Sequence, residues 1–226
     1  IFLHIFEKNY INMGTNITDK VQSAFETTCL KYGTILKTGF EPWANDERYS
    51  IHETNQVMNF MKSYKSIADD GCITWAELSV PYVTIDNNGV EHKKTNHLDG
   101  FIIDGYNVFF IEAKRFSRKN KKIDELGNDL SAIIDFGKDR AAKEQFMNRL
   151  PDKANKQNYN FYCILLADVW NYRNKRKNET KRIDIDWKKI VEDYSNKNSG
   201  NITYLDCDNK EVYDSNYNLA YALFNL

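Results

Sequence analysis

The chain has 226 residues, of which 42% are hydrophobic, and this is enough for one domain with a substantial core. Its formal net charge of −1 means that nucleic-acid binding would require positive charge to be clustered on one face. No apolar run reaches membrane-spanning length, so no membrane association is expected. The four cysteines form no C-x-x-C pair, which argues against zinc and indicates a reducing, cytoplasmic location.

Two amphipathic helices are predicted at the start of the chain. Asn16 or Thr18 caps the first helix, and Gly33 ends it shortly after its last apolar residue. The second helix is predicted over residues 50–65, with an apolar stripe at helical spacing. Residues 1–15 precede the first good helix signal, and we interpret them as an extension outside the core fold.

Glu53 occupies a distinctive place in the second predicted helix. It lies one turn before Val57, so its carboxylate points toward the apolar stripe rather than away from it. A carboxylate at the buried edge of a helix is a candidate for an active site. The alternative is a first-turn glutamate that complements the helix dipole, and the sequence leaves both interpretations open.

Three antiparallel strands are predicted next, and they cover residues 73–85, 91–103 and 108–116. The turn between the first two contains Asn88-Gly89. A two-residue turn there pairs Glu77 with Gly100, whereas a three-residue loop places Glu77 opposite Asp99. Glu77 is therefore a second acidic candidate whose position depends on this register.

The hairpin between the second and third strands brings charged residues into apolar surroundings. Gly105 suits the first central position of a type II′ turn, and counting outward from it places Asp99 opposite Glu112 and His97 opposite Lys114. These four side chains should cluster at one end of one face. Two opposed carboxylates repel each other without a cation, so the pattern favours a metal site, the alternative being a salt-bridged group.

The remaining predicted elements complete a mixed sheet with helices packed on both faces. They are a long helix over 124–150, a strand over 161–169, a helix over 186–194, a strand over 202–205 and a C-terminal helix over 217–224. The whole chain is expected to form a single domain. Its core would span about residues 50–170, with peripheral elements over 171–226.

Asp99-Gly100, the apolar hairpin and Glu112-Ala113-Lys114 together resemble the signature of the PD-(D/E)XK nucleases. The resemblance covers roughly residues 50–169, and it departs from the family pattern at Leu98, where the family has proline. It implies the restriction endonuclease-like fold, which is an α/β fold with an αβββαβ core, and phosphodiester hydrolysis as the activity.

The resemblance also implies roles for individual side chains. Asp99 and Glu112 would bind Mg²⁺, with Mn²⁺ as a substitute, and Lys114 would assist the attacking water. Either Glu53 or Glu77 would supply a third acidic residue. The chemistry is reasonable without the resemblance, because two carboxylates suit a hard cation and leave positions for water and phosphate.

Two basic stretches could hold a phosphate backbone, and their alternative interpretation is as ordinary solvated loops. The candidates for nucleic-acid binding are Arg115, Lys119, Arg173, Lys175 and Arg176. We therefore predict a metal-dependent DNA endonuclease of restriction or defence type, with a homodimer as one way to cut both strands. The alternative is a catalytically inactive nuclease-like module that binds nucleic acid or a partner protein.

Overall fold

The computed structural model describes residues 16–37, 53–86, 88–116, 127, 131, 133, 140–148, 159–170, 172–174, 179–181, 186–197, 202–213 and 217–226. The predicted extension over residues 1–15 and most of the helix predicted over 124–150 lie outside these ranges. Lys119, Lys175 and Arg176 lie outside them as well.

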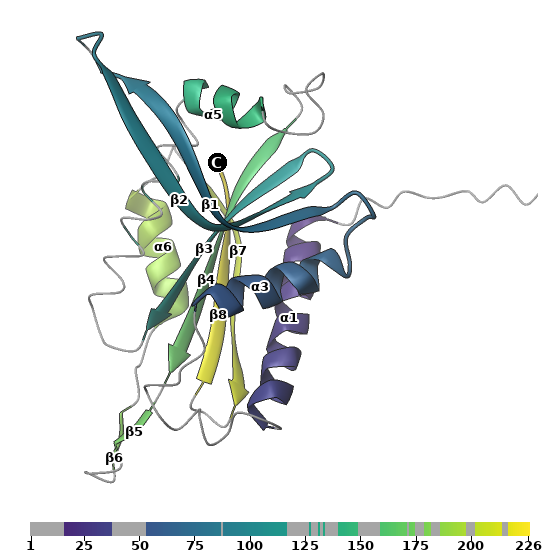
Figure 1. Ribbon diagram of the computed structural model, residues 1–226. Helices are drawn as coiled ribbons and strands as arrows, with labels where there is room; N and C mark the ends of the chain where they lie inside the picture. The colour runs from purple at the N-terminus through teal and green to yellow at the C-terminus, as the bar shows by residue number, and fades with distance from the viewer. Residues whose placement is uncertain are drawn as a thin grey trace, which may run out of the picture.

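A mixed six-stranded sheet forms the centre of the molecule, and its strand order is β1-β2-β3-β4-β8-β7 (Figure 1). The strands are β1 (Ile73–Ile85), β2 (Glu91–Asp104), β3 (Asn107–Phe116), β4 (Asn160–Trp170), β7 (Thr203–Tyr213) and β8 (Tyr217–Asn225). Strands β3 and β4 pair in parallel, and the other neighbours pair antiparallel. The predicted α/β class with a mixed sheet is therefore confirmed. A separate two-stranded ribbon consists of β5 (Tyr172–Asn174) and β6 (Glu179–Lys181).

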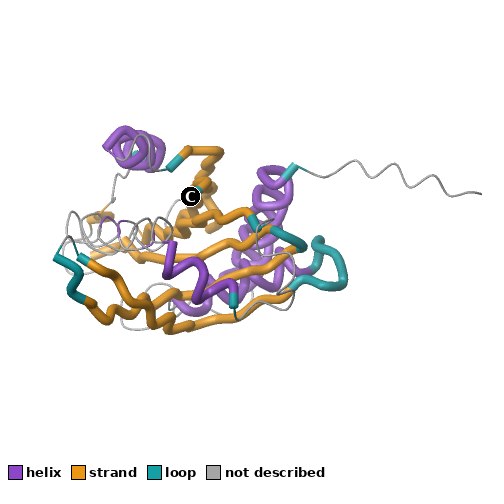
Figure 2. Tube along the Cα trace, turned by 90° about the horizontal axis from the view of Figure 1, so that it is seen from above, coloured by secondary structure: helices purple, strands orange, loops and turns teal. Residues whose placement is uncertain are grey.

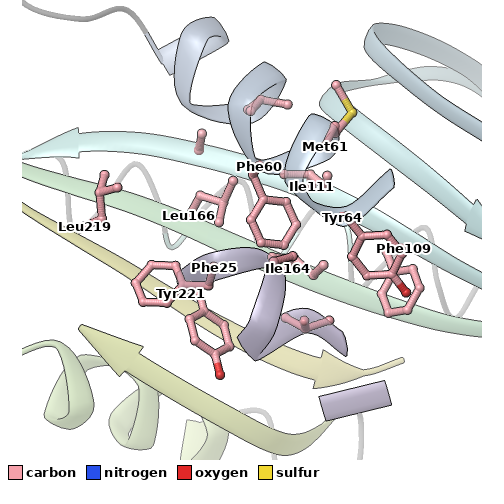
Figure 3. Close-up of a cluster of buried hydrophobic side chains, with 14 of the residues drawn as sticks. Phe25, Phe60, Met61, Tyr64, Phe109, Ile111, Ile164, Leu166, Leu219 and Tyr221 are labelled. Atoms are coloured by element: carbon pink, nitrogen blue, oxygen red, sulfur yellow. The ribbon is translucent and has the colours of Figure 1, made fainter. Parts of the chain in front are cut away.

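Helices cover both faces of the sheet (Figure 2). The helices α1 (Ile17–Ile35) and α3 (Glu53–Lys65) pack on one face, and α5 (Arg140–Met147) and α6 (Trp187–Lys197) pack on the other. Alternate residues of each central strand point to opposite faces, so the buried side chains form two separate clusters. Figure 3 shows the cluster beneath α1 and α3, in which Phe25, Phe60 and Phe109 are fully buried or nearly so.

The two N-terminal helices follow the predicted pattern with one exception. Asn16 caps α1, since its side chain accepts a hydrogen bond from the Thr18 backbone N–H at 3.4 Å. The prediction that Gly33 ends the helix is wrong, because α1 continues to Ile35. Gly33 instead permits close packing on β7: a Cβ there would lie 3.0 Å from the Val212 carbonyl oxygen. None of the helices in the described ranges has the length and apolar character needed to cross a membrane.

The loop between β1 and β2 decides the register that the sequence left open. Ile85 pairs with Glu91, and the Asp86 N–H donates to the Val90 carbonyl at 3.0 Å, so three residues remain in the loop. This register places Glu77 opposite Asp99. Glu77 itself interrupts the ladder with a φ of 55°, a left-handed conformation that is uncommon for a residue other than glycine.

The C-terminal segment differs from its prediction. Residues 217–224 were predicted as a helix, and this is wrong: they belong to β8, which lies between β4 and β7. Leu219 and Leu223 pack beneath α1 and α3, whereas Ala220 and Phe224 pack toward α5 and α6. A strand buried on both faces has no polar side, so its apolar run does not distinguish strand from helix. This part of the segment 171–226 is therefore central to the sheet rather than peripheral.

Candidate active site

The β2–β3 hairpin positions the two carboxylates that the sequence singled out. Gly105 has a φ of 59° and begins the two-residue turn, so Asp104 pairs with Asn107, as predicted. The ladder runs from there to the pair of Gly100 with Ile111, and one further step places Asp99 opposite Glu112. At that step the regular pairing stops.

Asp99 occupies the gap where the two strands separate. Its Oδ2 accepts a hydrogen bond from the Ala113 N–H at 2.8 Å, so the carboxylate of β2 takes the place of a main-chain acceptor for β3. The side chain is half-buried. This contact fixes the Asp99 carboxylate against the β3 backbone, directly beside Glu112.

Glu112 and Lys114 form an ion pair at the end of β3. The Lys114 Nζ donates to the Glu112 Oε1 at 2.8 Å, and the two side chains are 14% and 6% exposed. Residues two apart on a strand share a face, which brings the ammonium beside the carboxylate. A carboxylate that is so deeply buried needs such a partner, because burying an isolated charge is costly.

Glu112 also affects a neighbouring thiol on β4. Burial and the nearby Glu112 charge raise the pKa of Cys163 well above its ordinary value. The thiol therefore stays protonated and neutral at physiological pH, and it is unsuited to be a nucleophile or a metal ligand. The carboxylates and the lysine are therefore the groups at this end of the sheet that could take part in a reaction.

Both candidates for the third acidic residue lie around the beginning of α3. The Glu53 Oε1 accepts a hydrogen bond from the Arg115 N–H at 2.7 Å, which ties the first turn of α3 to the end of β3. Glu77 is exposed, and its Oε1 accepts from the Thr54 hydroxyl at 3.3 Å. Glu53 thus contacts the residue that follows Lys114. Glu77 instead lies opposite Asp99 across the sheet, and its side chain contacts Thr54 of α3.

A buried polar cluster that the sequence reasoning missed lies behind this site. The Arg115 Nε donates to the Asp168 Oδ2 at 3.1 Å, and the Tyr217 hydroxyl donates to the same oxygen at 2.8 Å. Burial raises the pKa of Asp168 to about 6, against the opposing effects of Arg115 and Tyr217. The available signal was the single charge in the apolar run of β4, which the parallel register places beside Arg115.

Arg115, which was predicted to bind phosphate, is instead paired with Asp168 in this cluster. Its side chain is only 13% exposed and is held by Asp168, so its first role is inside the protein.

Arg173 lies on β5, while the other basic candidates lie outside the described residues. His97 is exposed and lies 2.9 Å from the Ser79 hydroxyl, on the part of β2 that pairs only with β1.

The side chains at the site include oxygen donors of the kind that a divalent metal ion binds. Within the ranges that the structure describes, no group of three or more His, Cys, Asp or Glu side chains is placed to hold a metal. The oxygen donors that the hairpin brings side by side are the carboxylates of Asp99 and Glu112. Mg²⁺ commonly binds one or two protein carboxylates and completes its shell with water and substrate phosphate, so this donor pair fits it.

Comparison with known proteins found no matching family model, no matching curated protein and no matching solved structure. The fold and the site define an α/β protein with two carboxylates and a lysine gathered at one end of its central hairpin.

Proposed function

We propose that this chain is a metal-dependent phosphodiester hydrolase of the PD-(D/E)XK type. Within that type, we propose that it is a DNA endonuclease. The observation that carries the proposal is the end of the β2–β3 hairpin. There Asp99 and Glu112 come from neighbouring strands, and the Lys114 ammonium is held 2.8 Å from the Glu112 carboxylate.

The order of elements around the site supports the same proposal. Helix α3 precedes the meander β1-β2-β3, helix α5 follows it, and β4 then pairs with β3 in parallel. This sequence of elements agrees with the αβββαβ core of restriction endonuclease-like proteins. Asp99 and Glu112 would hold a Mg²⁺ ion, which lowers the pKa of a bound water and offsets charge on the scissile phosphate.

The protein's own groups have distinct tasks in this proposal. The Lys114 ammonium orients the attacking water and stabilises the charge that develops on the phosphate. The Ala113 N–H keeps the Asp99 carboxylate in place through its 2.8 Å hydrogen bond. Glu53 fixes the backbone at Arg115, so that the end of β3 that carries Lys114 does not shift.

The direct test is incubation with plasmid DNA, single-stranded DNA and RNA, with and without Mg²⁺ or Mn²⁺. We expect metal-dependent cutting of DNA, and we expect Asp99→Ala, Glu112→Ala and Lys114→Ala each to slow it by about 10²-fold or more. Asp104→Asn is the matched control, since Asp104 is a buried carboxylate at the opposite end of β2. Equal cutting by the wild type and the three alanine variants would contradict the proposal.

The ion pair between Lys114 and Glu112 favours one other function, because it neutralises the buried carboxylate without a metal ion. This is a catalytically inactive module that binds nucleic acid or a partner protein through the same fold. Calorimetry separates the two functions, because the nuclease should bind Mn²⁺ and lose that binding in Asp99→Ala and Glu112→Ala. Mn²⁺ binding that is absent, or that both variants retain, would favour the module.

A further inference from the structure

Beyond the candidate site, β1 and β2 continue together as a two-stranded ribbon. Their ladder extends to the pair of Ile85 with Glu91, whereas β2 pairs with β3 only as far as Gly100. Residues 79–97, here named the β1–β2 arm, therefore have no third strand beside them in the described structure, and Figure 1 shows the arm standing out from the sheet. At ~3.3 Å per residue, its paired part is about 20 Å long.

Much of the arm is exposed to solvent. The side chains of Ser79 and Pro81 on β1 are exposed, and so are those of residues 91–95 and His97 on β2. An isolated hairpin of this kind is only marginally stable in water. Among the side chains of residues 79–97 that the structure describes, none belongs to either buried cluster, which points to a task outside the core.

Asp86 makes several contacts at the tip of the arm. Its Oδ1 accepts hydrogen bonds from the backbone N–H groups of Asn88 and Val90 at 2.8 and 2.9 Å. Its Oδ2 lies 3.2 Å from the His92 Nε2. These contacts tie Asp86 to Asn88, Val90 and His92 before any partner arrives, which lowers the entropy lost on binding.

Outside its tip, residues 86–91, the arm carries positive charge only. Its acidic residues, Asp86 and Glu91, are at the tip, and Asp86 is already in contact with His92. Between the tip and Asp99, the charged residues are Lys93 and Lys94, both of which are exposed. Because successive side chains of a strand point to opposite faces, these lysines present an ammonium on each side of the ribbon.

We propose that the β1–β2 arm binds duplex DNA by lying in its major groove, with Lys93 and Lys94 at the phosphates of the two groove walls. A two-stranded ribbon fits the major groove of B-DNA, which is about 12 Å wide, whereas the major groove of A-form RNA is too narrow for it. The proposal rests on the proposed function, because the arm joins the body at Asp99 and would hold the duplex against that site.

The test is fluorescence anisotropy of a labelled DNA duplex, without divalent metal so that no cutting occurs. We compare the wild type with the double variant Lys93→Ala/Lys94→Ala over a series of salt concentrations. We expect the variant to bind about tenfold more weakly at ~0.1 M salt, and its log–log salt slope to fall by about 2. Lys188→Ala/Lys189→Ala is the matched control, an adjacent exposed pair on α6 that should behave as the wild type.

The other outcomes distinguish a failure of the arm proposal from a failure of the proposed nuclease function. If the wild type cuts DNA and the arm variant keeps its affinity and salt slope, the arm proposal is wrong and the nuclease stands. Equal binding of an RNA duplex would overturn the major-groove assignment. A changed association state in sedimentation, with DNA affinity unaltered, would mean that the arm contacts a second copy. A wild type that binds no nucleic acid would overturn both proposals.

Discussion

Glu112 is a buried carboxylate whose charge is balanced by a neighbouring lysine. Its side chain is 6% exposed, and the Lys114 ammonium lies 2.8 Å away. Lys114→Met removes that ammonium, and we expect it to lower the free energy of unfolding by ~2 kcal/mol. Urea unfolding followed by circular dichroism measures this change.

The double variant Glu112→Gln/Lys114→Met provides the control for that prediction. It removes both charges, so it should recover part of the stability that Lys114→Met alone loses. The coupling energy from this double-mutant cycle should be clearly different from zero. Strictly additive changes would mean that the observed pair does not stabilise Glu112.

Asp168 should make folding depend on pH. Burial raises its pKa from the ordinary value of 3.8 to about 6, so the fold favours the protonated acid. This contribution to stability is complete below the lower value and is lost as the pH rises through about 6. Since one pKa unit corresponds to 1.36 kcal/mol, the loss amounts to about 3 kcal/mol.

The comparison with Asp168→Asn isolates this effect. The free energies of unfolding of the two proteins are measured from pH 4 to pH 7, and their difference is plotted. Relative to the variant, the wild type should become less stable as the pH rises. The same pH dependence in both proteins would show that Asp168 is not the group that titrates.

The elements around the site differ in how far the sequence predicts them. The β2–β3 register was predictable, because the glycine of a two-residue turn fixes every pair by counting. The Arg115–Asp168 pair could not be predicted, because it depends on the parallel register of β3 with β4, and no local sequence pattern specifies that register. The prediction failed at β8 for a related reason: a segment apolar on both faces carries no periodicity.

The packing of α3 on β2 depends on Gly100. A Cβ at this position would lie 2.8 Å from the Val57 Cγ1 and 3.2 Å from the Met61 Sδ, so the Val57 side chain or the helix that carries it would have to shift. We expect Gly100→Ala to lower the free energy of unfolding by ~1–3 kcal/mol. Cutting should also decrease, since Glu53 joins the same helix to the end of β3.

Gly71→Ala is the control for Gly100→Ala. No atom lies within 4 Å of a Cβ built at Gly71, so thermal unfolding should be nearly unchanged. Equal effects of the two substitutions would show that the contact with α3 is not the cause.

At the scale of the whole molecule, the two hydrophobic clusters share the central strands β3, β4 and β8. Removal of β7 and β8 would expose one edge of β4 and part of both clusters. We therefore expect a chain truncated after Asn201 to lose cooperative unfolding. The measurement is thermal denaturation by circular dichroism, and a cooperative transition like that of the full chain would contradict the central place of β8.

The proposed function requires that the carboxylates and Lys114 at the end of the β2–β3 hairpin cut phosphodiester bonds with a divalent metal ion. Glu112→Gln tests it with the smallest change, because the amide keeps the shape of the side chain and removes its charge. The decisive measurement is the rate of plasmid cutting in Mn²⁺ by the wild type and by this variant. We expect metal-dependent cutting that Glu112→Gln slows by about 10²-fold or more. Equal rates, or cutting that needs no metal, would contradict it.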